Sequence, residues 1–225
     1  MYLLLDGDPA VGRALRGSTV AAVRAAGGKR IQVNVVDAAI GPPFGVDPDP
    51  AVTQVTAALS AWVPDDAPGL EAALPPAGET GAWYGYAVTE AEPRANTSVP
   101  PGPNGRVPGF AQLVLLRVPD DMSPSEWRER WEGHTSIALA TQSTFRYVQN
   151  VIIRPLSDGA PDYVAVMEEC FPMAAATDLQ VFFDAVGDEA KLARRMAAMS
   201  DSCDRFMDGD APVAWTAEYL FPEDE

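Results

Sequence analysis

Residues 110–141 read FAQLVLLRVPDDMSPSEWRERWEGHTSIALAT, and this stretch decides the fold. Its first part, residues 110–118, is rich in Leu and Val and predicts a strand. Ser123 can then cap the free amides of a helix, and Pro124 suits the first helical position. Glu126 stands three residues after Ser123, as a capping box requires, and the helix should run to about Thr141. A strand followed by a long helix is the opening of an α+β unit.

The residues that follow continue this unit. Tyr147 lies in the next apolar run, and Leu179, Phe182 and Phe183 share one face of a predicted helix. The pattern predicts strands at 145–154, 163–171 and 214–221, and helices at 175–185 and 188–206. The order is therefore β-α-β-β-α-β.

The first part of the chain follows the same order less distinctly. Residues 30–36 alternate apolar and polar side chains, which is typical of a half-buried strand. Further strands are predicted at 2–5, 52–63 and 83–88, with a helical stretch from Asp8 to Gly28 and a short helix at 69–74. Two pairs of similar short segments at matching positions support a repeat. They are Trp62-Val63-Pro64 with Cys170-Phe171-Pro172, and Ala82-Trp83 with Ala214-Trp215.

A Pro- and Gly-rich segment at 93–109 separates the two units, since such a composition sustains neither a helix nor a strand ladder. We therefore expect a divergent unit at 1–92, a linker at 93–109 and a second unit at 110–225. A single unit of this kind covers one face of its sheet with helices and leaves the other face bare. The predicted fold class is α+β, with two fused ferredoxin-like units packed sheet to sheet as a pseudo-dimer.

The composition limits the classes of function. The chain carries 16 basic and 32 acidic residues, a net charge of -16, which disfavours nucleic acid and anionic membranes as partners. The N-terminus lacks a secretory signal, and no apolar run approaches the roughly 20 residues that span a bilayer. A cytoplasmic location is therefore expected. One histidine and two distant cysteines, Cys170 and Cys203, do not supply a typical transition-metal site, so no cofactor or metal is expected.

The predicted helix within 123–141 carries the strongest candidate site. Trp127, Trp131 and His134 fall at i, i+4 and i+7, so they share one face, which must point inward because it holds two Trp. His134 is the only histidine of the chain. The strand that follows carries Tyr147-Val148-Gln149-Asn150.

In these residues the chain resembles the EthD-like family of the dimeric α/β-barrel superfamily. The family pattern has two aromatic residues and a His within one helix, followed by a strand with Tyr-Val-Gln-Asn. The resemblance covers residues 110 to the end; after the His, however, this chain has Thr135-Ser136-Ile137 where the family often has an Ala-Pro-Leu-like run. The resemblance implies a cleft between sheet and helices that accepts a hydrophobic, often aromatic or polyketide-like molecule. EthD-like and related proteins include cyclases, dehydratases and cofactor-free monooxygenases, and also members with no established activity.

The candidate residues have distinct expected roles. His134 exchanges protons near neutral pH and is the predicted general acid/base, and Tyr147 could donate a hydrogen bond to a developing oxyanion. Trp127, Trp131, Asn150 and Glu168 are the predicted ligand-binding residues. Glu168 and Glu169 are adjacent on one strand, so one of them must face inward and could orient His134. The alternative is that His134, the two Trp and Tyr147 have only a structural role as core residues.

Three functions remain open on the sequence alone. The first is a cofactor-independent enzyme that uses His134, and the second is a non-catalytic small-ligand carrier or accessory protein. The third is haem binding through His134, but nothing in the sequence points specifically to the wide pocket and the propionate-binding basic residues that haem needs. The first unit has no histidine, so the site should lie in the second unit. The two units could also assemble further as a homodimer.

Overall fold

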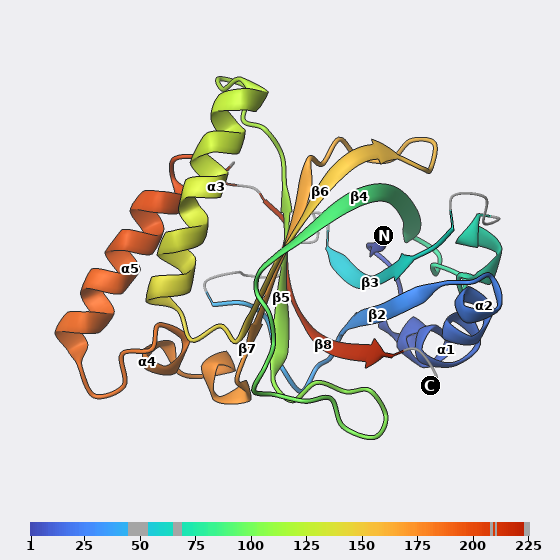
Figure 1. Ribbon diagram of the computed structural model, residues 1–225, viewed down its shortest axis with the longest axis horizontal. Coiled ribbons are helices and arrows are strands. Elements are labelled where there is room, and N and C mark those ends of the chain that lie inside the picture. Colours follow the sequence, from blue (N-terminus) through green and yellow to red (C-terminus); the bar gives the residue numbers. More distant parts are fainter. Residues whose placement is uncertain (45–53, 65–68, 208, 210, 223–225) are drawn as a thin grey trace.

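Eight strands in the described part of the chain pair side by side into one closed antiparallel barrel, with the longer helices outside it (Figure 1). The computed structural model describes residues 1–44, 54–64, 69–207, 209 and 211–222. The order around the barrel is β1-β3-β2-β8-β5-β7-β6-β4. None of the described helices is long and apolar enough to cross a membrane.

The elements have the following bounds. The strands are β1 (Tyr2–Leu5), β2 (Lys29–Val36), β3 (Val55–Trp62), β4 (Ala82–Arg94), β5 (Phe110–Leu116), β6 (Arg146–Pro155), β7 (Ala165–Phe171) and β8 (Val213–Phe221). The longer helices are α3 (Pro124–Thr141) and α5 (Glu189–Cys203). Shorter helical segments are η1 (Pro9–Val11), α1 (Gly12–Ala14), η2 (Leu15–Thr19), α2 (Val20–Ala25), η3 (Leu70–Ala73), η4 (Met173–Ala176) and α4 (Leu179–Phe182).

The prediction of two ferredoxin-like units packed sheet to sheet is wrong. Strand β2 pairs with β8 from Ile31 to Val36, and β4 pairs with β6 from Tyr86 to Arg94. These two ladders join the edges of the two halves, so the bare faces are buried by closing one continuous sheet on itself. The first half also lacks a long second helix, because only the four residues of η3 form a helix between the described parts of β3 and β4. The equivalence of the two halves as repeats stays a prediction.

Most predicted elements occur near their expected positions. Ser123 is the N-cap of α3 and its hydroxyl accepts a hydrogen bond from the Glu126 amide, which confirms the predicted helix start. The predicted helix at 175–185 is divided into η4 and α4. Strand β3 matches the prediction for 52–63, although residues 52 and 53 lie outside the described residues.

The predicted linker at 93–109 begins inside a strand, since β4 runs on to Arg94. Its last residue, Gly109, has a φ of 107°, and a Cβ there would lie 2.1 Å from the carbonyl oxygen of Phe171. Glycine is therefore needed where β5 comes up against β7. The predicted domain boundaries themselves stay a prediction.

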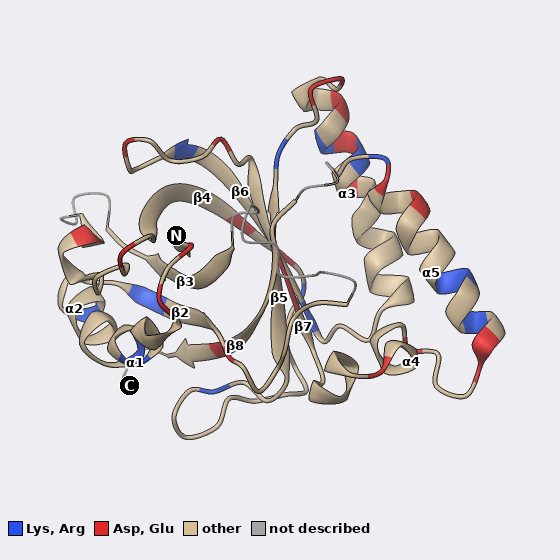
Figure 2. Cartoon of the chain, turned by 180° about the vertical axis from the view of Figure 1, so that it is seen from behind, with Lys and Arg blue, Asp and Glu red and all other residues tan. Residues whose placement is uncertain are grey.

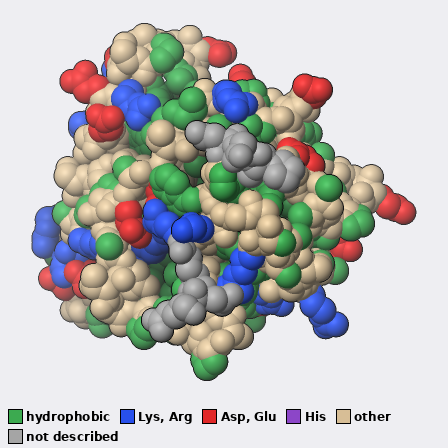
Figure 3. Space-filling view, turned by 45° about the vertical axis from the view of Figure 1, so that its right-hand side comes forward, with side chains coloured by type: hydrophobic (Ala, Val, Ile, Leu, Met, Phe, Trp, Pro, Cys, Tyr) green, Lys and Arg blue, Asp and Glu red, His purple; other side chains and the backbone are tan. Residues whose placement is uncertain are grey.

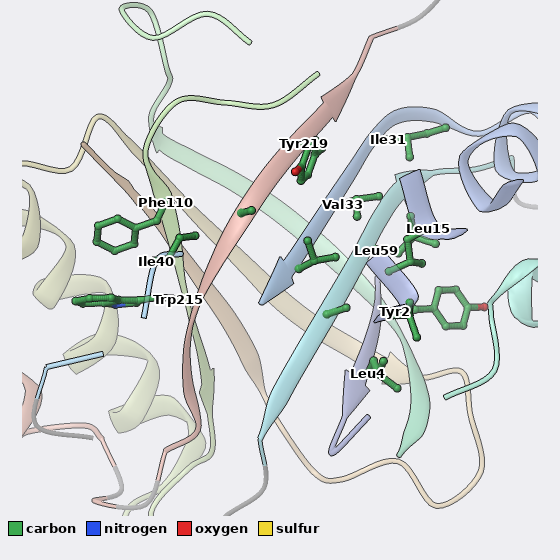
Figure 4. Close-up of a cluster of buried hydrophobic side chains, with 14 of the residues drawn as sticks. Tyr2, Leu4, Leu15, Ile31, Val33, Ile40, Leu59, Phe110, Trp215 and Tyr219 are labelled. Atoms are coloured by element: carbon green, nitrogen blue, oxygen red, sulfur yellow. The ribbon is translucent and has the colours of Figure 1, made fainter. Parts of the chain in front are cut away.

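Alternate side chains of the strands serve two different cores. One cluster combines Leu3, Tyr86, Leu113 and Val166 from strands of both halves, with no residue of α3 or α5, so it fills the barrel interior. The opposite faces pack under helices. Leu15 and Val23 cover the outer face of the first half, where they join the cluster drawn in Figure 4.

The second half is covered by α3 and α5, which run beside each other outside β5, β6 and β7 (Figure 1). Lys, Arg, Asp and Glu are spread along both helices (Figure 2), so one face of each meets water. On the face shown in Figure 3, basic side chains are interspersed with apolar ones rather than gathered in a single field.

A charged cluster lies in the barrel interior beside the apolar core. Arg146 Nη1 donates to Glu218 Oε1 at 2.7 Å, to Gln32 Oε1 at 3.1 Å and to Glu168 Oε1 at 3.3 Å. Arg146 Nε also donates to Glu92 Oε1 at 2.7 Å. Burial disfavours the charge on Arg146, but Glu168 and Glu218 outweigh it, so the pKa of Arg146 is raised. Burial and the neighbouring Glu168 raise the pKa of Glu218 to about 7.

Replacing this arginine should be costly. We expect Arg146→Met to lower the free energy of unfolding by about 3–5 kcal/mol, because it leaves buried carboxylates without their counter-charge. Urea unfolding at pH 7 measures the change. Arg130→Met is the matched control, since Arg130 is exposed and pairs with Glu126 on the surface of α3, where such a pair is worth about 1 kcal/mol or less. A loss for Arg146→Met as small as that of the control would show that the cluster is not a structural clamp.

Candidate functional site

A cavity of about 270 Å³ lies between the outer face of β5, β7 and β8 and the helices α3, α4 and α5; we call it the outer cleft. Its apolar wall includes Met167, Phe182, Met199 and Trp215. Phe44 stands over this wall, with its ring edge-on to that of Trp215 at 5.1 Å between centroids. The polar side chains that line the outer cleft are Gln112, His134, Gln142, Glu169 and Cys203. The cleft therefore offers an aromatic enclosure with a few polar groups, as small-molecule sites do.

His134 reaches the outer cleft from the inward face of α3. It is 2% exposed, and its Nδ1 shares a hydrogen bond of 2.9 Å with Ser202 Oγ on α5. Its ring packs against that of Phe206 at 4.9 Å between centroids. Burial lowers the pKa of His134 to about 4, so the imidazole is neutral at physiological pH.

Glu169 reaches the same cleft from β7. Its Oε2 accepts a hydrogen bond of 3.0 Å from Gln112 Nε2, and Gln112 Oε1 in turn accepts one of 2.9 Å from Trp215 Nε1. This chain fixes the orientation of the carboxyl group. The other oxygen, Oε1, is buried and has no hydrogen-bond partner among the described residues. Burial raises the pKa of Glu169 to about 7.

Two further groups complete the polar side of the outer cleft. The side-chain oxygen of Gln142 is also buried without a partner in the described part of the chain. Unpaired buried acceptors are costly, so Glu169 and Gln142 together indicate a place for hydrogen-bond donors supplied by a ligand or by water. The pKa of Cys203 is raised to about 12 by burial and by Glu169, so its thiol stays protonated and is a poor nucleophile.

Of the residues predicted from the sequence, His134 is the one that lines the outer cleft. Trp127 and Trp131 stack on each other at 5.1 Å between centroids and belong to the core under α3, where Trp127 Nε1 donates to the Phe206 carbonyl. The hydroxyl of Tyr147 donates to Met167 Sδ at 3.0 Å, and its side chain is fully buried in the same core. The structure thus places these three side chains behind the cleft wall.

The other two predicted ligand-binding residues point to the opposite side of the sheet. Glu168 lies in the barrel interior with Arg146, and Asn150 faces the same interior from β6. The alternation of β7 therefore sends Glu168 away from His134 and sends Glu169 towards the outer cleft. Both glutamates were considered from the sequence, but the sequence does not show which of them faces the barrel interior and which faces the helices.

Several residues of the outer cleft carried no sequence signal for a site. Gln112 is one polar position in an apolar strand, and Trp215 lies on the last strand, 81 positions after His134. Gln112 had one available clue, because a polar residue in the middle of a run of Leu and Val needs a partner when both faces of the strand are buried.

One group of described residues has metal-ligand chemistry. Ligand atoms of Glu168, Cys170 and Glu218 lie within 4.8 Å of one another in the barrel interior. Both carboxylates, however, already bind Arg146, and the Cys170 thiol donates to Glu218 Oε2 at 3.3 Å. The guanidinium therefore occupies the position of the counter-charge that a cation would otherwise provide.

The raised pKa of Glu169 makes stability depend on pH. The folded-state pKa of about 7 lies above the ordinary value of 4.5, so the contribution of Glu169 is fully present below pH 4.5 and is lost as the pH rises through 7. Relative to wild type, Glu169→Gln should become more stable across this range, by up to about 1.4 kcal/mol per pH unit. Urea unfolding of both proteins between pH 4.5 and 8.5 measures the difference. The contribution of His134, which has the opposite sign, cancels because both proteins contain it; a difference that does not vary with pH would contradict the burial of an unpaired carboxyl.

The comparisons with known proteins bear on the second half of the chain. Neither the curated proteins nor the solved structures provide a match. A family model described as EthD domain matches residues 119–210, which is less than half of the chain. This range contains α3, β6, β7 and α5 but not β5, β8 or any strand of the first half. Residues 119–210, which carry both His134 and Glu169, therefore match the EthD domain family.

Proposed function

We propose that this protein is a cofactor-independent enzyme that moves a proton on a small aromatic or similarly hydrophobic molecule bound in the outer cleft. The observation that carries this proposal is the buried Oε1 of Glu169, which has no partner among the described residues and lies in the same cleft as His134. An engineered cavity of about 150 Å³ holds benzene. The 270 Å³ of the outer cleft therefore suit a molecule of one or two rings.

The electrostatics assign the two polar groups different roles. A general base works best when its pKa lies near the working pH, and the pKa of Glu169 is about 7 while that of His134 is about 4. Glu169 is therefore the proposed base, in place of the role expected for His134 from the sequence. Its carboxylate would remove an acidic C–H or O–H proton, and the electron pair of that bond would pass to a substrate oxygen.

Neutral His134 would then stabilise the oxygen that gains charge. When the Ser202 hydroxyl donates to Nδ1, the ring carries its proton on Nε2 and can donate it to an enolate or phenolate. The apolar wall around both groups strengthens this hydrogen bond by excluding water. Proton removal of this kind is a suitable first step for cyclisation, dehydration or oxygenation, the reactions named by the family resemblance.

Binding without chemistry is the alternative function. It is favoured by the strong burial of both groups, since His134 is 2% exposed and Glu169 is 1% exposed. A carrier would use Glu169, Gln142 and His134 only as hydrogen-bonding groups. The two functions differ in whether a bound molecule exchanges its acidic protons.

Deuterium exchange distinguishes the two functions. 2-Tetralone has two rings and acidic α-hydrogens, and we expect the wild-type protein in D₂O to accelerate their exchange, as followed by proton NMR. Glu169→Gln should lower the exchange rate about 10²–10⁴-fold, the usual contribution of a general base, while 2-tetralone still binds. Glu168→Gln is the matched control, because the same change on the adjacent residue faces the barrel interior. Binding by the wild type without acceleration would favour the carrier.

The pH profile gives a second test of the assignment. If ionised Glu169 is the base, the rate constant for exchange should rise with pH through about 7 and stay level above it. A profile that instead rises through about 4 and is level at pH 6 would return the role of base to His134.

A further inference from the structure

A second and larger cavity, of about 1030 Å³, opens at the end of the barrel interior where β2, β3, β4 and β6 meet the segment 95–101; we call it the barrel mouth. It lies on the other side of the sheet from the outer cleft and shares no lining residue with it. Its volume is at the upper end of the range for small-molecule sites. The proposed function does not use it.

The least exposed polar residue that lines the barrel mouth is Asn150. It is 3% exposed and lines the cavity, and its side chain makes no hydrogen bond with any residue that the structure describes. The amide atoms border the cavity rather than sealed protein, so they are open to a hydrogen-bonding group there. The Asn150 amide is therefore positioned for a group that enters the barrel mouth.

Acidic side chains flank this amide. Glu90 on β4 is the direct cross-strand partner of Asn150 on β6, so their side chains lie on the same face about 5 Å apart at Cβ. Glu92 lines the cavity two residues further along β4. One oxygen of Glu90 accepts from Arg30 and one of Glu92 accepts from Arg146, while no described donor binds the second oxygen of either.

The charge beneath these residues is also negative. The single guanidinium of Arg146 faces the three carboxylates of Glu92, Glu168 and Glu218. Gln32 lies beside them, and its amide nitrogen already donates hydrogen bonds to Glu168 and Asn34. Glu168 and Glu218 do not line the cavity themselves, but they place more negative than positive charge around Arg146 directly behind its floor, which favours a cationic donor there.

The walls above the floor are largely apolar. Tyr86 and Leu59 are buried side chains that line the cavity, and Trp62, which is 52% exposed, stands at its rim. These surfaces can pack against a hydrocarbon or aromatic body. The Arg30 guanidinium lies over the Trp62 ring at 5.3 Å, so a cation already occupies this aromatic face at the rim.

We propose that the barrel mouth binds an organic ammonium ion with an apolar body, its charged nitrogen donating to Asn150 Oδ1 and to the carboxylates of Glu90 and Glu92. Arg30 and Arg154 also line the cavity, and they are the argument for an anion instead. Arg30, however, is 54% exposed at its side chain and already pairs with Glu90 at 2.6 Å, and Arg154 is exposed. Neither guanidinium is thus both buried and free, whereas the Asn150 amide is buried and has no partner among the described residues.

Three probes with the same aromatic body test this proposal on the wild-type protein. Isothermal titration calorimetry at pH 7 and low salt would compare 2-phenylethylamine, 2-phenylethanol and 3-phenylpropanoate, which are a cation, a neutral molecule and an anion. The amine should bind at least tenfold more tightly than the alcohol, and the carboxylate should bind least. Equal or tighter binding of the alcohol or carboxylate, or no binding of the amine at millimolar concentration, would overturn the proposal.

Location is tested separately, because the outer cleft could also accept an aromatic ring. A crystal of the complex with ring-brominated 2-phenylethylamine locates the ligand by the anomalous signal of bromine. The signal should lie in the barrel mouth, and a signal confined to the outer cleft would overturn the assignment. Since the two cavities are on opposite sides of the sheet, failure here would leave the proposed proton transfer at Glu169 untouched.

Two variants test the contacts. Asn150→Leu and Glu90→Gln should each weaken amine binding at least tenfold, and Glu90→Gln should do so with little change in volume. Glu129→Gln, an exposed change on α3 with the same loss of charge, is the matched control and should change binding less than twofold. If Asn150→Leu does not fold, Glu90→Gln decides. Loss of affinity equal to that of the control would show that the floor makes no specific contact.

Discussion

The Arg146 guanidinium joins five strands of the barrel, because it extends from β6 to partners on β2, β4, β7 and β8. Gln32 and Glu92 come from the first half of the chain and Glu168 and Glu218 from the second, so one cation connects both halves from inside. The cluster also fixes the polarity of the interior. Since the carboxylates at Arg146 cannot share their space with apolar side chains, the interior divides into an apolar core around Leu113 and a polar end that opens into the barrel mouth.

Local structure was predictable to the extent that it depends on neighbouring residues. Ser123 and Pro124 determine where α3 begins, and the alternation of residues 30–36 identifies β2 as a strand. The arrangement of strands was not predictable in this way. The ladders between β2 and β8 and between β4 and β6 consist of backbone hydrogen bonds, which any residue with an amide can make. Alternation also shows that a strand has two different faces. It does not reveal whether a bare face of the sheet is buried against a second sheet or by closure of the same sheet into a barrel.

The candidate site could likewise be predicted from the sequence only in part. The i, i+4 and i+7 spacing correctly placed Trp127, Trp131 and His134 on the inward face of α3, but only the histidine reaches the cleft. On β7, a shift of one residue in the register would exchange the faces of Glu168 and Glu169. That register is set by the pairing of β7 with β5 and β6. Likewise, the pKa values that distinguish Glu169 from His134 arise from burial, which depends on segments of the outer cleft that are distant in sequence. Residue type gave the chemistry, and tertiary packing gave its location.

Closure of the barrel also imposes an order of events on the chain. Strand β8 (Val213–Phe221) is inserted between β2 and β5, so the ring stays open until this strand has been made and has reached a partner about 180 residues before it. Contacts of such long sequence separation are slow to form, since the chain loses the entropy of a large loop before the contact can stabilise it. Until then β2 and β5 expose unpaired edges that can pair with another chain. During synthesis, the interval before β8 arrives is thus the period in which this protein is most exposed to misassembly.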